Sequence, residues 1–152
     1  MKIGGVVVSH DKGLSGHSDG DVLLHAITDA LLGAVAAPDI GALFPPSDPR
    51  WKGADSELFL REALNRVRDA GYGLANMDAS LVLAAPKIGP HTATIRAHVA
   101  ELLGVRSDCV GLKAKTPEGL NLENTAVAHV VVLLEAKVGK RELSRRRGSK
   151  LR

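Results

Sequence analysis

Residues 17–29, with the sequence HSDGDVLLHAITD, contain the side chains whose types and spacing could do chemistry. Two histidines, His17 and His25, and three aspartates fall within the mouth and first turns of an expected helix. Free backbone amides at a helix N-terminus attract anions, and a glycine there lets a ligand approach closely. His17, Ser18 and Gly20 therefore favour a phosphate site, while His25, farther along the helix, could bind a metal ion.

The helix that must position these groups is predicted to run from about residue 19 to residue 36. Ser18 is the expected N-cap, and the helix should end before the next proline because the residue preceding a proline avoids α geometry. Asp21, His25 and Asp29 are spaced four residues apart and would share one face of the helix. A solvated face carrying one histidine gives the same pattern, so the spacing alone leaves that alternative open.

The rest of the chain alternates between strand and helix signals. Strands are predicted at residues 3–9, 72–85, 110–115 and 126–136. Further helices are predicted at residues 56–70, with Ser56 as N-cap, and at residues 92–103, and residues 39–49 read as a loop rich in turn formers. The run 81–84 is typical of a strand buried on both faces. This order predicts an α+β protein, a single-domain α/β sandwich with helices packed on one face of a mixed sheet.

Composition limits the kind of protein this can be. The 152 residues are 45% hydrophobic and 24% charged, which suits one compact domain. The single cysteine, Cys109, excludes an intrachain disulfide and favours a reducing compartment. No apolar run approaches the roughly 18 residues that span a membrane, and the N-terminus lacks a signal-peptide core. We therefore expect a cytoplasmic protein with no membrane contact.

The net charge of +3 comes from the C-terminal tail. Residues 139–152 contain seven basic residues and one acidic residue, a local charge of +6, so residues 1–138 carry a net charge of −3. The tail has no apolar period and no aromatic side chain to stack on a base. The sequence thus favours a folded domain at 1–138 followed by a disordered tail, and argues against a nucleic-acid partner.

Four ordered motifs carry a resemblance to a known family: HSDGDVLLHAITDALLGA at 17–34, DIG at 39–41, FPPSD at 44–48 and KGADS at 52–56. They closely resemble the 2-C-methyl-D-erythritol 2,4-cyclodiphosphate synthases, the cyclising enzymes of the non-mevalonate isoprenoid pathway, and the resemblance extends from Ile3 to about Lys137. It implies a lyase that converts 4-diphosphocytidyl-2-C-methyl-D-erythritol 2-phosphate into the cyclic diphosphate and CMP. It also implies a homotrimer with active sites between neighbouring subunits.

The resemblance assigns two sets of residues to the substrate. The helix mouth and the loop behind it would contribute His17, Ser18, Asp39, Ile40, Gly41, Phe44 and Asp48. The loops after two later strands would contact the cytidine diphosphate group through Ala85, Pro86, Lys87, Thr116 and Glu118. His17 and Thr116 would be the catalytic members, and Thr116 would stabilise the reacting phosphates.

Two metal ions are implied by the same resemblance. The family histidine that matches His25 is one of three protein ligands of zinc, and the other two come from an Asp-x-His pair on a preceding strand. This sequence begins after that point, so the zinc site is incomplete here. Glu118 would bind magnesium or manganese that bridges the phosphates. His129, at a position often held by Glu, would line the central channel of a trimer.

Two departures from the family pattern keep alternatives open. Pro46 stands where an Asp is common, and a phosphate-facing arginine after Leu120 has no counterpart. Together with the incomplete zinc set, they also fit a truncated, non-catalytic trimeric remnant that binds cytidine nucleotides. A third reading is a metal-dependent phosphohydrolase built on His17, His25 and the aspartates, which would release a linear diphosphate.

Overall fold

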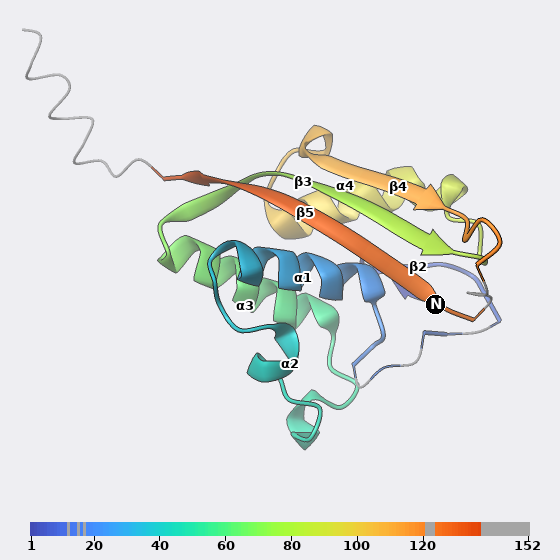
Figure 1. Cartoon of the computed structure of the whole chain (residues 1–152), viewed down its shortest axis with the longest axis horizontal. Coiled ribbons are helices and arrows are strands. Elements are labelled where there is room, and N and C mark those ends of the chain that lie inside the picture. Colours follow the sequence, from blue (N-terminus) through green and yellow to red (C-terminus); the bar gives the residue numbers. More distant parts are fainter. Residues whose placement is uncertain (12, 15, 17, 121–123, 138–152) are drawn as a thin grey trace, which may run out of the picture.

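The computed structural model describes residues 1–11, 13, 14, 16, 18–120 and 124–137. The expectations for His17 and for the basic tail at 139–152 lie outside the described residues. The mixed sheet has the strand order β4–β3–β5 (Figure 1). The central strand β3 (Tyr72–Leu83) is parallel to β4 (Val110–Lys115) and antiparallel to β5 (Ala126–Ala136), so the sheet is mixed, as predicted.

Three main helices pack on this sheet. They are α1 (Val22–Ala34) against β5, α3 (Ser56–Asp69) against β3 and α4 (Thr92–Leu103) against β4. Shorter elements are α2 (Ile40–Leu43), η1 (Pro49–Trp51), η2 (Gly89–His91) and η3 (Ser107–Cys109). No helix in the described part of the chain is long and apolar enough to cross a membrane.

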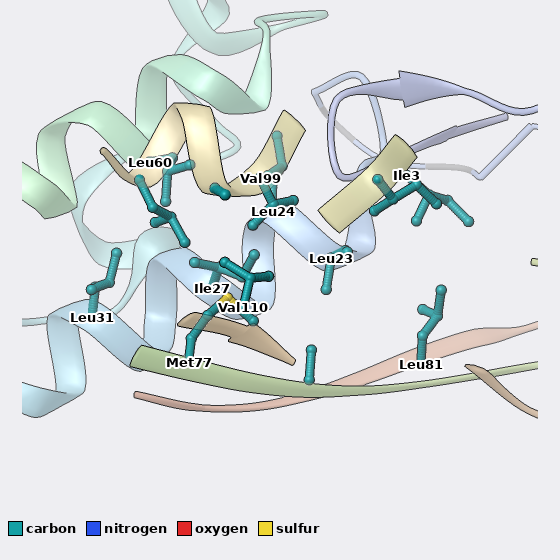
Figure 2. Packing of buried hydrophobic residues seen from close by; sticks show 14 of the residues in the cluster. Ile3, Leu23, Leu24, Ile27, Leu31, Leu60, Met77, Leu81, Val99 and Val110 are labelled. Atoms are coloured by element: carbon teal, nitrogen blue, oxygen red, sulfur yellow. The ribbon is translucent and has the colours of Figure 1, made fainter. Parts of the chain in front are cut away.

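The core lies between the helices and one face of the sheet (Figure 2). Met77 and Leu81 of β3 both point toward the side of the sheet that the helices cover, Met77 next to Ile27 of α1 and Leu81 below Ile3, and these side chains are buried. From Asn76 to Leu83, buried residues of β3 alternate with exposed or half-buried ones because only one face of the strand meets helices of the same chain. Within one chain the prediction that residues 81–84 are buried on both faces is therefore wrong, since Val82 is half-buried and Ala84 is exposed.

The N-terminal segment is a hairpin rather than the single strand predicted at residues 3–9. Strands β1 (Lys2–Ile3) and β2 (Val6–Val7) pair antiparallel around a turn made by Gly4 and Gly5. The two glycines have φ values of +59° and +79°. A two-residue hairpin turn requires positive φ at central positions, and glycine adopts it without steric cost.

Helix α1 begins later than predicted, because Asp21 rather than Ser18 is its N-cap. The Asp21 carboxylate accepts hydrogen bonds from the backbone N–H groups of Leu23 and Leu24, at 3.1 and 3.0 Å. It also accepts from the N–H groups of Gly4 and Gly5 in the hairpin turn, at 2.9 and 2.7 Å. Asp21 is fully buried, and these four amides replace the water that it loses. One side chain thus starts the helix and joins the hairpin to it.

Aspartates also cap the next elements. Asp39 accepts a hydrogen bond from Ala42 N at the start of α2, within the segment predicted as a loop. Asp55, and not the predicted Ser56, caps α3 through Glu57 N. An aspartate is a strong N-cap because its charge suits the positive end of the helix dipole.

Candidate functional site

A small pocket of about 150 Å³ opens beside the first turns of α1. It brings together five residues that the sequence analysis assigned to the site and that lie up to 26 positions apart. We call it the helix pocket, and its lining residues are Ser18, His25, Ile40, Gly41, Phe44, Pro46, Trp51 and Phe59. A larger hollow of about 470 Å³ lies at the far end of the sheet but contains none of the predicted site residues, so size alone does not locate the site.

His25 is held from two sides in the helix pocket. Its Nε2 atom lies 2.9 Å from the Ser18 hydroxyl oxygen, within hydrogen-bonding distance. Its ring packs edge-on against Phe59, with ring centroids 6.0 Å apart. The Phe59 and Phe44 ring centroids are 4.5 Å apart, and the Phe44 and Trp51 ring centroids are 5.2 Å apart. The imidazole therefore meets a hydroxyl on one side and an aromatic wall on the other.

This cluster of Phe44, Trp51 and Phe59 was not predicted from the sequence. The chain has only four Phe, Trp and Tyr residues, and three of them meet here. Their spacing in the sequence could have indicated it, because three of the few aromatic residues lie within sixteen positions, between Phe44 and Phe59. Phe59 was missed because a helical apolar face predicts burial but not which pocket the buried ring adjoins.

Of the three residues predicted to share one face of α1, only His25 lines the helix pocket. The Asp21 carboxylate is used by four backbone amides, as described above. Asp29 accepts a hydrogen bond from Ile40 N at 2.8 Å and so ties α2 to α1. The interpretation of the three as one polar face is therefore wrong, since the two aspartates support the backbone around the pocket.

Asp39 and Asp48 were predicted to line the substrate, and neither lines the helix pocket. Asp39 caps α2, while Asp48 caps η1 and binds the Arg50 guanidinium, with Nε to Oδ2 at 2.9 Å. Hydrogen bonds from Arg50 hold the pKa of Asp48 below its ordinary value. Their contact with a substrate stays a prediction.

A second pocket, of about 270 Å³, lies where β3 and β4 end, and we call it the edge pocket. The two strands are parallel, so their carboxyl ends meet at one edge of the sheet. This brings Pro86 and Lys87, from the loop after β3, next to Lys115 and Thr116 at the end of β4. Ala85 adjoins the pocket in sequence but does not line it. Lys87 and Lys115 are exposed, and neither forms an ion pair within the described residues.

Glu118 stands next to the edge pocket in an unusual backbone conformation. Its φ is +48°, in the left-handed region that side chains other than glycine rarely adopt. Its carboxylate accepts a hydrogen bond from the Thr116 hydroxyl. Strained backbone of this kind is concentrated at functional sites. The arrangement places a hydroxyl and a carboxylate beside two lysines, a combination suited to phosphates and a divalent cation.

The described residues fit the two implied metal ions differently. They contain no group of three or more His, Cys, Asp or Glu side chains placed to hold a metal. Among these residues the His25 ring contacts the Ser18 hydroxyl and the Phe59 ring. This part of the chain therefore does not form a zinc site by itself. Glu118 does fit magnesium, which takes one or two carboxylates and fills its remaining positions with phosphate oxygens and water.

Comparisons with known proteins agree with this geometry. The model of the YgbB family matches residues 1–135. The 2-C-methyl-D-erythritol 2,4-cyclodiphosphate synthase of Koribacter versatilis (strain Ellin345) is 67% identical over 135 residues, which cover 89% of this chain and 87% of that protein. The chain belongs to the YgbB family.

Solved structures of similar proteins have the same fold. A 2C-methyl-D-erythritol-2,4-cyclodiphosphate synthase superposes with a TM-score of 0.84 at 44% identity, covering 89% of each chain. A form of such a synthase with bound CDP superposes with a TM-score of 0.84 at 42% identity and the same coverage. The predicted fold class is thus confirmed.

Proposed function

We propose that this chain catalyses the reaction for which its relatives are named. It converts 4-diphosphocytidyl-2-C-methyl-D-erythritol 2-phosphate into 2-C-methyl-D-erythritol 2,4-cyclodiphosphate and CMP, and so acts as a phosphorus-oxygen lyase in isoprenoid precursor synthesis. The 67% identity to a synthase of nearly the same length carries this proposal. The helix and edge pockets support it, because each holds groups suited to one end of that substrate.

The reaction is an intramolecular phosphoryl transfer. An oxygen of the 2-phosphate attacks the β-phosphorus, the bond from that phosphorus to the oxygen bridging to the α-phosphate breaks, and CMP leaves with this oxygen. The attacking phosphate is already an anion, so no general base is required. The protein has to fold the substrate back on itself and balance the charge of crowded phosphates, and positioning of this kind accounts for much of the rate.

The residues divide this work between the two pockets. In the helix pocket, the Ser18 hydroxyl would hold the 2-phosphate beside His25. His17, which is not among the described residues, is proposed to bind the same phosphate. In the edge pocket, Lys87 and Thr116 would bind the diphosphate, and the exposed lysine charge is free to pair with it.

Enzymes of this family depend on a divalent metal in general, and we propose magnesium or manganese for this chain. Glu118 would hold the ion beside the Thr116 hydroxyl. Such an ion, when bound, neutralises charge on the phosphate oxygens. We assign no step to zinc, because the described residues do not make a site for it.

We further propose that the protein is a homotrimer with shared active sites. The face of the sheet that points away from the helices exposes apolar side chains, with Val131 at 73% and Leu133 at 58% of their full accessibility. Large exposed apolar side chains in a row mark an association surface. His129 lies on the same strand and is exposed, opposite Ser80, so it would face the subunits' common axis. The helix pocket of one subunit would then meet the edge pocket of its neighbour.

We place the enzyme in the cytoplasm, where its one cysteine, Cys109, would stay reduced.

The test of function is incubation of the purified full chain with the cytidyl substrate and magnesium, with products followed by phosphorus NMR. Cyclic diphosphate and CMP in equal amounts are expected. A linear diphosphate would indicate a phosphohydrolase instead. No product, with cytidine nucleotides still bound, would indicate the non-catalytic remnant.

A further inference from the structure

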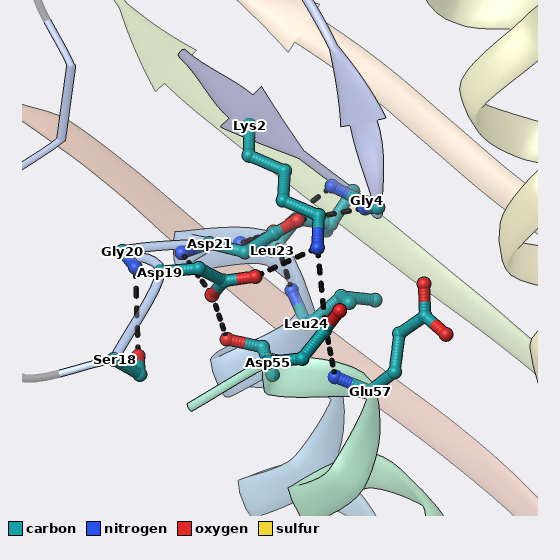
Figure 3. A network of polar contacts seen from close by, with 12 residues as sticks. Lys2, Gly4, Ser18, Asp19, Gly20, Asp21, Leu23, Leu24, Asp55 and Glu57 are labelled. Atoms are coloured by element: carbon teal, nitrogen blue, oxygen red, sulfur yellow. Dashed lines mark hydrogen bonds and ion pairs between the residues drawn. The ribbon is translucent and has the colours of Figure 1, made fainter. Parts of the chain in front are cut away.

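The turn at residues 18–21 lies between the N-terminal hairpin and the start of α3 (Figure 3). Its backbone is anchored to the segment before α3, because Asp19 N donates to Ala54 O at 3.1 Å. Gly20 has a φ of +73°, and a Cβ there would lie 2.5 Å from Leu14 O, so only glycine fits. The turn thus has one tight backbone path, and Ser18 stands at its outer end.

The carboxylate of Asp19 is held from two sides. Its Oδ1 atom accepts hydrogen bonds from the Ser56 hydroxyl and from Asp21 N. Its Oδ2 atom is buried, and the ammonium group of Lys2 at 2.8 Å is its one partner within the described residues. A buried carboxylate oxygen left without a partner is strongly unfavourable. The position of Asp19 therefore depends on Lys2.

Lys2 comes from β1 and contacts a second carboxylate. Its Nζ atom lies 3.0 Å from Asp55 Oδ1, the oxygen that caps α3 through Glu57 N. Burial by itself would lower the pKa of Lys2, but the hydrogen bonds that it donates to Asp19 and Asp55 raise the pKa above its ordinary value. Burial likewise opposes ionisation of Asp19, yet hydrogen bonds from Lys2 and Ser56 hold its pKa below the ordinary value. Both partners stay charged at neutral pH.

The hairpin consequently holds both ends of the turn. Lys2 binds Asp19, and the amides of Gly4 and Gly5 bind Asp21 two residues later. Figure 3 shows these contacts converging on one side of the turn, with Ser18 on the other side. Because Ser18 directly precedes Asp19, a shift of Asp19 moves the hydroxyl that lies 2.9 Å from His25.

We infer that Lys2 is a positioning residue for the proposed substrate site: by holding Asp19 it fixes the Ser18 hydroxyl where the 2-phosphate binds. The inference rests on the proposed function. It assigns a role in substrate binding to a side chain that lines neither pocket, and it restricts that role to the phosphate end, since the edge pocket shares no residue with this network.

The test compares two ligands in the full chain. Trp51 is the only tryptophan and lines the helix pocket, so its fluorescence reports substrate binding, measured without divalent metal to prevent turnover. Calorimetry reports CDP binding. For Lys2→Met we expect the Kd of the substrate to rise about tenfold while the Kd of CDP changes less than about twofold, and Lys2→Arg to restore most of the affinity.

Two further variants separate positioning from folding. Asp55→Asn keeps an efficient N-cap and removes the negative charge of the second partner of Lys2, while the ion pair with Asp19 stays, so substrate affinity should stay unchanged. Ser56→Ala removes the other side-chain contact of Asp19 and should raise the substrate Kd about threefold even where Lys2→Met does not fold. The inference is overturned if Lys2→Met or Ser56→Ala leaves the substrate Kd unchanged, or raises the Kd values of substrate and CDP equally. Absence of CMP release by the wild-type chain would instead contradict the proposed function, while the binding comparison would still judge the role of Lys2.

Discussion

The helix pocket and the edge pocket are built in opposite ways. The helix pocket is supported by buried Asp21 with its four amide partners, by the ion pair between Lys2 and Asp19, and by three packed aromatic rings. The edge pocket lies between loop ends and contains two exposed lysines without ion pairs in the described residues, and the Glu118 carboxylate stands next to it on a strained backbone. The first is rigid within one chain, whereas the second is open, which is expected of a surface completed by a ligand or a neighbouring subunit.

The largest effect should come from the helix pocket. His25→Ala removes the one titratable side chain that lines it among the described residues, and we expect kcat/KM to fall at least about 100-fold. Rates of CMP release measure this. His98→Gln is the matched control, since His98 lies on α4 against Glu57 and outside both pockets, and its kcat/KM should stay within about twofold. Similar losses in both variants would mean that His25 acts only through folding.

A stability measurement should separate the two pockets further. Asp21→Asn removes the charge that all four amides share and replaces one acceptor oxygen with an NH2 donor, so at least one amide loses its acceptor. We expect the free energy of unfolding to fall by about 2 kcal/mol. Thr116→Val in the exposed edge pocket should change it by less than about 0.5 kcal/mol. Urea denaturation of both variants measures the difference. Equal effects would contradict the contrast between a rigid and an open pocket.

CDP binding, unlike stability, should depend on the edge pocket. Lys87→Met removes a charge from the edge pocket, so the Kd of CDP should rise about tenfold. The control is Arg61→Met on the exposed side of α3, which should leave CDP binding unchanged. Calorimetry on both variants decides whether the lysine contacts the diphosphate or is only a solvated surface charge.

The smallest effect is a pH dependence of stability. The pKa of Asp19 is lowered in the folded protein, so its contribution is present above the unfolded value of about 4 and is lost as the pH falls through the folded value. The pKa of Lys2 is raised, so its contribution is lost only on strong alkalinisation. Urea midpoints from pH 5 down to 2 should fall more steeply for the wild type than for Asp19→Asn. Parallel curves would show that Asp19 gains nothing from Lys2.

Elements with local signals could be predicted from the sequence. The helix at residues 92–103 was predicted with both ends correct, since its apolar spacing is regular and Gly104 provides a left-handed C-cap with φ of +68°. The bounds of the last two strands, at residues 110–115 and 126–136, were also predicted correctly from their local sequence. The motifs that meet in the helix pocket were also recognised, because they are close in sequence or carried by family resemblance.

Contacts between distant residues could not be predicted in the same way. Ser18 and Asp21 are both good N-caps, and Asp21 prevails because a hairpin seventeen residues away supplies two further amides. Lys2 reads as an ordinary charged residue at the N-terminus, yet it binds a carboxylate fifty-three residues along the chain. Local patterns specify periodicity and caps, but not the partner that a polar side chain finds after folding.

The most direct test of the account mixes two inactive variants. His25→Ala disables the helix pocket and Lys87→Met combined with Thr116→Ala disables the edge pocket, so each variant alone should release little CMP. In co-expressed mixed trimers, random assembly pairs an intact helix pocket with a neighbour's intact edge pocket at about a quarter of the sites. We predict recovery of CMP and cyclic product to about that fraction of wild-type activity. Mixed trimers that stay inactive would contradict an active site shared between subunits.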